Sequence, residues 1–192
     1  MGDKAQETSP SLDDSIAAFR AMMASKALSR LQAAPVACRL LVDGKSNGEL
    51  WQGSLMSCTE RVLRRHKITH IVNAAKDLGS FFKTWASEHL PKVKILGPEF
   101  FHLDWVDSSD QKLWKDKKYD QLVESSKWIH AALTEGKKVL VHCAEGKSRS
   151  SAVVIAYLMT RNMSFDAALD FVRSKWPRAD PNPGFRSQVR HL

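Results

Sequence analysis

The chain has 192 residues, of which 43% are hydrophobic and 26% are charged, and its formal net charge is +8 at pH 7. A chain of this length predicts one domain with an appendage and excludes two full domains of ordinary size. The basic excess favours acidic partners, but aromatic and basic residues are not interleaved, so nucleic acid is not an expected partner.

The first 35 residues are predicted to form a polar tail followed by one helix. Residues 1–11 are small and polar, and apolar residues then recur near helical spacing from Ile16 to Leu31. Pro35 ends this pattern. We therefore expect an N-terminal tail and helix over residues 1–35 and one further domain over residues 36–192.

No membrane anchor is expected. The sequence has no apolar run long enough to cross a bilayer, and its N-terminus "MGDKAQETSP" lacks the apolar stretch of a secretory signal. Gln6 stands where a myristoylation signal requires Ser or Thr, so lipidation is not expected either.

Strand and helix patterns alternate along the rest of the chain. The expected strands are 36–42 and 49–55, joined as a hairpin by a turn rich in Gly and Asn, and then 68–75, 93–96, 100–107 and 137–143. The expected helices are 59–67, 119–135, 150–162, 164–176 and 182–192. This alternation predicts an α/β fold with a central, mostly parallel sheet flanked by helices.

The three cysteines do not form a disulfide framework, because Cys38, Cys58 and Cys143 are odd in number and widely spaced. A reducing compartment, the cytoplasm or the nucleus, is therefore expected. No Cys-x-x-Cys pair is present, and His66 and His70 lack further ligands at suitable spacing. We expect no metal and no other cofactor.

The stretch "LVHCAEGKSRSS" (140–151) places a cysteine between a buried strand and a helix. Loop amides in this arrangement converge near a positively polarised helix N-terminus, where they bind phosphate and stabilise a thiolate. Arg149 follows Cys143 after five residues and can close the loop around an anion with two hydrogen bonds. The "GKS" triplet is not a nucleotide-binding loop, because Val141 stands where that motif requires Gly.

The motif "HCAEGKSRS" resembles that of the cysteine-based protein tyrosine phosphatase superfamily, and its Gly and Ser-Arg-Ser resemble the dual-specificity branch most. The stretch "GELWQGSL" is similar to the Leu-Tyr-x-Gly-Ser strand of that branch, "ITHIVNAA" to its Asn-Ala-Ala strand, and "PNPGF" to its Asn-x-Gly-Phe segment. The resemblance covers about residues 36–192. It implies a protein tyrosine phosphatase-like fold and metal-independent hydrolysis of phosphoric monoesters.

The resemblance also implies residue roles. Cys143 would attack phosphorus, Arg149 would bind the phosphoryl group, and Ser150 would help the sulfur to leave. His142 would orient the loop and help to keep the thiol ionised, while Gly146 would allow the tight curvature. The loop residues expected to hold the substrate's phosphate are Ala144, Glu145, Gly146, Lys147 and Ser148.

A general acid is expected in "HLDWVDSSDQ", upstream of the cysteine. The family pattern places apolar residues four and two positions before the acid, and Leu103 and Trp105 satisfy it for Asp107. Asp110 is the reserve, and Asp104 fits less well. The following segment 108–119 is longer than the branch usually has and carries four lysines, so it is either a basic recognition surface or a solvated loop.

The expected substrate is a phosphoprotein carrying phosphotyrosine, phosphoserine or phosphothreonine, which implies a role in signalling. Two alternatives stay open, and a third, an RNA triphosphatase suggested by the charge of +8, is not supported because aromatic and basic residues are not interleaved. Lys147 adds positive charge to the loop, as in phosphoinositide phosphatases, although Glu145 offsets it. A phosphoprotein-binding scaffold without turnover is the other alternative, although Cys143, Arg149 and an acid are all present. The sequence does not specify an oligomeric state.

Overall fold

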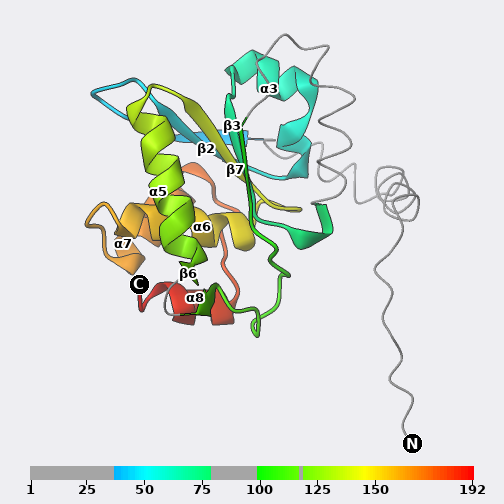
Figure 1. Ribbon diagram of the computed structural model, residues 1–192, viewed down its shortest axis with the longest axis vertical. Coiled ribbons are helices and arrows are strands. Elements are labelled where there is room, and N and C mark those ends of the chain that lie inside the picture. Colours follow the sequence, from blue (N-terminus) through cyan, green and yellow to red (C-terminus); the bar gives the residue numbers. More distant parts are fainter. Residues whose placement is uncertain (1–36, 79–98, 117–118) are drawn as a thin grey trace, which may run out of the picture. The chain divides into compact units, whose positions relative to one another are not determined.

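The computed structural model describes residues 37–78, 99–116 and 119–192. Its main sheet has five strands in the order β1-β2-β7-β3-β4. Figure 1 shows these strands at the centre of the domain. Their bounds are β1 Ala37–Val42, β2 Glu49–Gly53, β3 His70–Asn73, β4 Glu99–His102 and β7 Lys138–His142.

The sheet is mixed but mostly parallel, as predicted. β1 pairs with β2 in the antiparallel direction, which confirms the hairpin, and the β2–β7, β7–β3 and β3–β4 pairs are all parallel. Their register aligns Gly53 and Asn73 with His142, and His102 with Asn73. The carboxyl ends of four parallel strands therefore meet at one edge, where α/β sheets commonly bind ligands.

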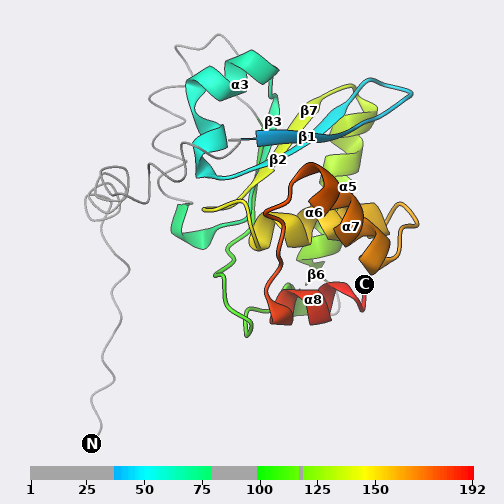
Figure 2. The ribbon, with the colours of Figure 1, turned by 180° about the vertical axis from the view of Figure 1, so that it is seen from behind.

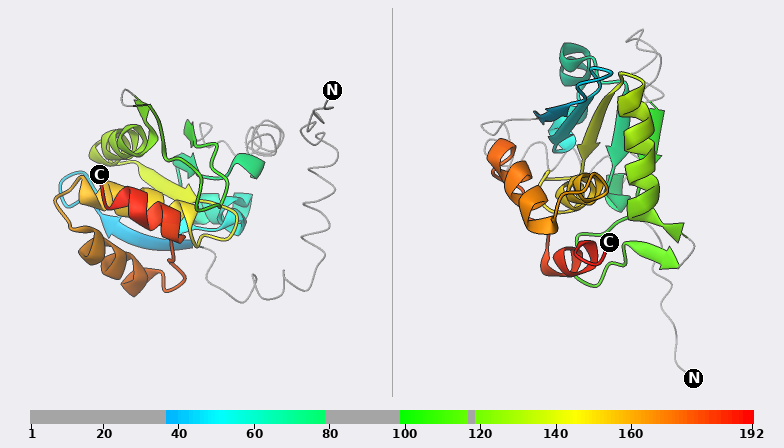
Figure 3. Two further views of the ribbon diagram at one scale, coloured as in Figure 1. Left: turned by 90° about the horizontal axis from the view of Figure 1, so that it is seen from below. Right: turned by 90° about the vertical axis from the view of Figure 1, so that its left-hand side faces the viewer.

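Three helices form a layer against this sheet. α5 and α6 pack on β7, α6 also contacts β2, α7 contacts β1, and α6 lies between α5 and α7. Figures 1 and 3 show this layer, with α8 beyond the end of α6, and Figure 2 shows β1 and β2 from behind. The helix bounds are α3 Glu60–His66, α5 Gln121–Thr134, α6 Arg149–Met159, α7 Phe165–Lys175 and α8 Pro183–Val189.

The core is built around β7 and α6. Val139, Leu140 and Val141 are fully buried, and every residue of α6 from its first position to Leu158 is buried. Each fully buried aliphatic side chain of this size contributes roughly 1.5–3 kcal/mol. The loop that joins β7 to α6 therefore starts and ends on the most tightly packed elements of the domain.

Two predicted elements differ from the structure. The strand expected over 100–107 ends at His102, and Leu103 and Trp105 are buried in a loop that continues to Asp107. Trp114–Asp116 (β5) and Tyr119–Asp120 (β6) form a short antiparallel pair where no strand was predicted, so the helix expected from residue 119 begins at Gln121.

Other predictions lie outside the described residues: the N-terminal tail and helix, and the strand over 93–96. Among the described residues, no helix is long and apolar enough to cross a membrane.

Candidate active site

The candidate site lies on the loop 143–148, which connects the carboxyl end of β7 to the first turn of α6. None of the backbone N–H groups at 144–148 donates a hydrogen bond to another residue in the described part of the chain. These amides lie beside the N-terminus of an 11-residue helix, whose dipole favours negative charge. The loop is therefore a cradle for an anion such as a phosphoryl group.

Gly146 allows this loop to turn sharply. Its φ is +72°, a conformation that side chains disfavour, and a Cβ atom there would lie 2.8 Å from the carbonyl oxygen of Gly53. Its own carbonyl accepts a hydrogen bond of 2.6 Å from Trp176 Nε1, and Trp176 is fully buried. The loop is thus held closely against the end of β2.

Cys143 and Ser150 face each other at the two ends of the loop. Cys143 Sγ lies 3.4 Å from Ser150 Oγ, and 1% of Cys143 and none of Ser150 is exposed. A hydroxyl at this distance donates a weak hydrogen bond to sulfur and stabilises it most when the sulfur carries negative charge. The pair expected from the sequence therefore lies together.

Arg149 connects the loop to the segment that carries the predicted acid. Its Nη1 donates to the carbonyl oxygen of Trp105 at 3.1 Å, and its Nε lies 3.8 Å from Asp107 Oδ2. Asp107 therefore stands beside the residue expected to bind phosphate. Asp104 is instead paired with His102, at 2.8 Å, and Asp110 is exposed.

Helix α8 holds the Asp107 segment in place. Asn182 Nδ2 donates to Asp107 Oδ1 at 3.0 Å, while Asn182 Oδ1 accepts from the Phe185 amide and caps the helix. A Cβ atom on Gly184 would lie 1.9 Å from the Ser109 carbonyl oxygen, so a side chain there would displace the segment. The motif "PNPGF" contains Asn182, but the sequence implies no role for this residue, since nothing in its spacing links it to Asp107.

His142 is neutral at physiological pH. Complete burial is the main cause that lowers its pKa to about 3; the charges of His102 and Arg149 act in the same direction, and the hydrogen bond to the Cys143 carbonyl opposes the shift. A positive charge on His142 therefore does not contribute to ionisation of the neighbouring thiol. Its Nδ1 lies 3.4 Å from the Cys143 carbonyl oxygen, so His142 contacts the loop backbone directly.

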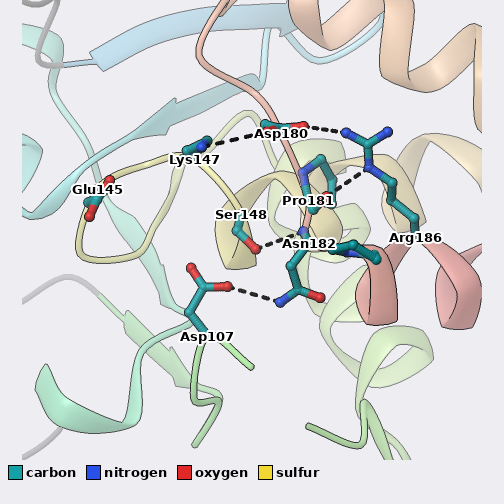
Figure 4. Close-up of a pocket in the computed structure, with 9 residues that line it drawn as sticks. Asp107, Glu145, Lys147, Ser148, Asp180, Pro181, Asn182 and Arg186 are labelled. Atoms are coloured by element: carbon teal, nitrogen blue, oxygen red, sulfur yellow. Dashed lines mark hydrogen bonds and ion pairs between the residues drawn. The ribbon is translucent and has the colours of Figure 1, made fainter. Parts of the chain in front are cut away.

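A pocket of about 650 Å³ opens beside the loop. Figure 4 shows Asp107 and Asn182 on one side and Lys147, Asp180 and Arg186 on the other. Although burial favours the neutral acid, the hydrogen bond from Arg186 and the charges of Arg186 and Lys147 lower the pKa of Asp180. Lys147 Nζ lies 3.5 Å from Asp180 Oδ2, so this carboxylate offsets the lysine's charge.

Other candidate residues lie in different environments. His66 stacks on Trp51, with ring centroids 4.3 Å apart, whereas His70 belongs to β3. Burial raises the pKa of both the Cys38 and the Cys58 thiols. Across residues 37–78, 99–116 and 119–192, no three His, Cys, Asp or Glu side chains are grouped so as to hold a metal ion.

Comparisons with known proteins identify relatives of this chain. The family profile described as "Dual specificity phosphatase, catalytic domain" matches residues 50–192. Human protein phosphatase Slingshot homolog 3 is 36% identical over 131 residues, which cover 67% of this chain and 17% of that protein. Dual specificity protein phosphatase 1 of Arabidopsis thaliana is 34% identical over 145 residues, covering 74% of this chain and 65% of that protein.

The fold has solved counterparts. The crystal structure of human DUSP28 matches with a TM-score of 0.63 and 28% identity, covering 83% of this chain and 93% of that one. The chain spans less than two thirds of the length of the two curated relatives: 17% of the human Slingshot homolog 3 and 65% of the Arabidopsis phosphatase.

Proposed function

The chain belongs to the dual-specificity phosphatase catalytic-domain family, and from this premise we propose that it hydrolyses phosphoprotein monoesters through a cysteinyl-phosphate intermediate. The observation that carries the proposal is the amide cradle at 144–148, with Cys143 and Ser150 3.4 Å apart at its ends. The loop amides bind the phosphoryl oxygens, and Arg149 adds a positive charge beside them. This arrangement stabilises the charge of a transferring phosphoryl group by position and hydrogen bonding.

In the first step the Cys143 thiolate attacks phosphorus, and the bond from phosphorus to the ester oxygen breaks. The leaving oxygen takes the electron pair of that bond and receives the carboxyl proton of Asp107. Asp107 lies beside Arg149 and is held by Asn182, so it stands next to the phosphate site. The products are the free alcohol or phenol and a phosphorylated cysteine.

In the second step water attacks phosphorus, and the bond from sulfur to phosphorus breaks. The Asp107 carboxylate takes a proton from the water, and inorganic phosphate leaves. The sulfur keeps the electron pair of the broken bond and becomes a thiolate again. Ser150 stabilises this thiolate by donating a hydrogen bond, without transferring its proton.

The pocket favours a protein substrate over a phosphoinositide. A phosphoinositide headgroup carries several phosphates and requires unneutralised positive charge around the catalytic loop. Lys147 is the loop's one lysine and lies beside Asp180, which also pairs with Arg173 and Arg186, while two further carboxylates, Glu145 and Asp107, line the pocket together with Arg186. A phosphorylated side chain on a protein carries one phosphate and suits this mixed charge, so phosphotyrosine, phosphoserine and phosphothreonine are the proposed substrates.

The proposal is tested by hydrolysis of para-nitrophenyl phosphate and of phosphotyrosine and phosphoserine peptides, with a chelator present. We expect turnover of all three substrates that is insensitive to the chelator, and mass spectrometry of rapidly quenched samples should find a phosphoryl group on Cys143. Tight binding of phosphopeptide without release of phosphate would instead establish the scaffold alternative.

Replacing Asp107 with asparagine is expected to slow the first step and to remove the fall in rate at high pH. Only the protonated acid can donate to the leaving oxygen, so wild-type activity falls as pH rises, whereas asparagine does not titrate. We expect a loss of about 10²- to 10⁴-fold on a phosphoserine peptide. The loss should be smaller on para-nitrophenyl phosphate, because nitrophenolate leaves more readily without a proton. The measurement is kcat/KM as a function of pH for both substrates.

Asp110→Asn is the matched control, because Asp110 lies in the same loop and is exposed like Asp107, but has no contact with Arg149 or Asn182 among the described residues. A wild-type pH profile in Asp107→Asn, combined with a lost high-pH limb in Asp110→Asn, would transfer the acid role to Asp110.

A further inference from the structure

We propose that Gln52 is a positioning residue that orients the Ser150 hydroxyl toward Cys143 and thereby accelerates release of the sulfur in the second step. This inference rests on the proposed function. Gln52 lies near the carboxyl end of β2, is fully buried, and reaches the loop 143–148 with its side-chain amide.

The Gln52 amide nitrogen contacts the middle of the loop and the first turn of α6. Nε2 lies 2.7 Å from Ser151 Oγ, 3.3 Å from the Gly146 carbonyl oxygen and 3.5 Å from Ser150 Oγ. Two N–H groups face these three acceptors, and the contact to Ser150 Oγ is the longest of the three. One side chain therefore ties the middle of the loop to the first turn of α6.

The orientation of this amide follows from its partners. The Gly146 carbonyl can only accept a hydrogen bond, so the atom that faces it carries the hydrogens. Ser151 uses its own proton on the Lys147 carbonyl, at 2.7 Å, and so also accepts from Gln52. The nitrogen, not the oxygen, therefore faces the loop.

This orientation determines where the Ser150 proton points. A lone pair of Ser150 Oγ faces the Gln52 N–H, so its hydroxyl hydrogen is directed elsewhere, and Cys143 Sγ is the acceptor at 3.4 Å. If an apolar side chain replaced Gln52, the hydroxyl could rotate and lose this alignment. The alignment matters most when the sulfur becomes a thiolate, since hydrogen bonds to charged groups are the stronger ones.

Stability alone does not account for a glutamine at this position. Its Oε1 is buried and has no hydrogen-bond partner among the described residues, which costs stability. The other groups it contacts have further partners: Trp176 for the Gly146 carbonyl, and the Lys147 carbonyl for Ser151. A methionine of similar volume should therefore leave the thermal stability of the fold nearly unchanged.

The test measures the two chemical steps separately, by stopped-flow and quenched-flow with para-nitrophenyl phosphate, in wild type, Gln52→Met, Ser150→Ala and the double variant. We expect Gln52→Met to slow hydrolysis of the phosphocysteine about threefold to tenfold, with little change in its formation, so that a burst of nitrophenolate appears. Ser150→Ala should slow the same step more, and adding Gln52→Met to it should cause no further loss.

Trp176→Phe is the matched control. Trp176, like Gln52, donates a hydrogen bond to the Gly146 carbonyl, but Trp176 has no hydrogen bond to Ser150. This control should leave the ratio between the rates of phosphocysteine formation and phosphocysteine hydrolysis unchanged. Gln52→Val, which suits a strand, replaces Gln52→Met if the latter fails to fold.

The proposal is overturned if Gln52→Met keeps the wild-type ratio between the rates of the two steps. It is also overturned if the double variant loses the product of the two single-variant fold-losses in the rate of phosphocysteine hydrolysis. Either result would leave the phosphatase proposal standing. Absence of any phosphocysteine in the wild type would refute the phosphatase proposal itself.

Discussion

Cys143→Ser is expected to lose at least about 10⁴-fold in turnover of every phosphomonoester, while binding of phosphopeptide is retained. The serine hydroxyl occupies nearly the same volume, so the amide cradle and Arg149 keep their places. A hydroxyl is much harder to ionise than a thiol, and His142, whose pKa is lowered to about 3, is too weak a base to take its proton, while Ser150 offers only another hydroxyl. The measurements are kcat/KM for para-nitrophenyl phosphate and the Kd of a phosphotyrosine peptide by calorimetry.

The control for this variant is Cys38→Ser. Cys38 lies on β1, and its thiol donates to the Lys175 carbonyl at 3.0 Å. It belongs to no part of the candidate site, so wild-type turnover is expected. Residual turnover of Cys143→Ser within tenfold of wild type would exclude a cysteinyl-phosphate mechanism, even if the cradle still bound phosphate.

The loop itself could be anticipated from sequence because its determinants are local. An apolar strand, a polar loop and an apolar helix follow one another within "KVLVHCAEGKSRSSAVV", and the structure has β7, the loop and α6 there. The hairpin of β1 and β2 and the strand β3 were likewise predicted, because each is a short β-branched or apolar run between turn residues. Each of these predictions depends on residues adjacent in the chain.

The segment after β4 was predicted as strand for a physical reason. Leu103 and Trp105 alternate with polar residues, as in a half-buried strand. In the structure they are buried because they anchor a loop: the Leu103 amide donates to the Asn73 carbonyl at 2.8 Å, and Trp105 packs on Phe185 with ring centroids 5.8 Å apart. Alternating burial does not distinguish a strand from a loop that is fixed at every second residue.

The supporting residues could not be found from sequence because they are remote from the groups they hold. Asn182 contacts Asp107 across 75 positions, and Gln52 contacts Ser151 across 99. A buried glutamine in a strand, or an asparagine before a proline, has several common roles, such as a helix cap. Only the three-dimensional arrangement shows that these amides reach the two catalytic segments.

Arg149→Lys is expected to lower kcat/KM by about 10³-fold or more, although the charge is conserved. The planar guanidinium holds the Trp105 carbonyl through Nη1 and, in the proposed mechanism, also offers paired N–H groups to two phosphoryl oxygens. Lysine presents one compact charge and cannot make both sets of contacts. The variant should weaken binding of inorganic phosphate and slow the first step together, which is measured by product inhibition and by single-turnover kinetics.

The same substitution should also weaken the contribution of Asp107. Arg149 joins the loop to the Trp105–Asp107 segment, alongside the bond from Asn182 to Asp107, so a lysine at this position leaves Asp107 less firmly positioned beside the leaving oxygen. In the Arg149→Lys background, Asp107→Asn should therefore cost less than it does alone, because the two residues act as a unit. Arg190→Lys, on the surface and paired with Asp166, should retain wild-type activity. Strictly multiplicative losses in the double variant would show that Arg149 binds phosphate without positioning the acid.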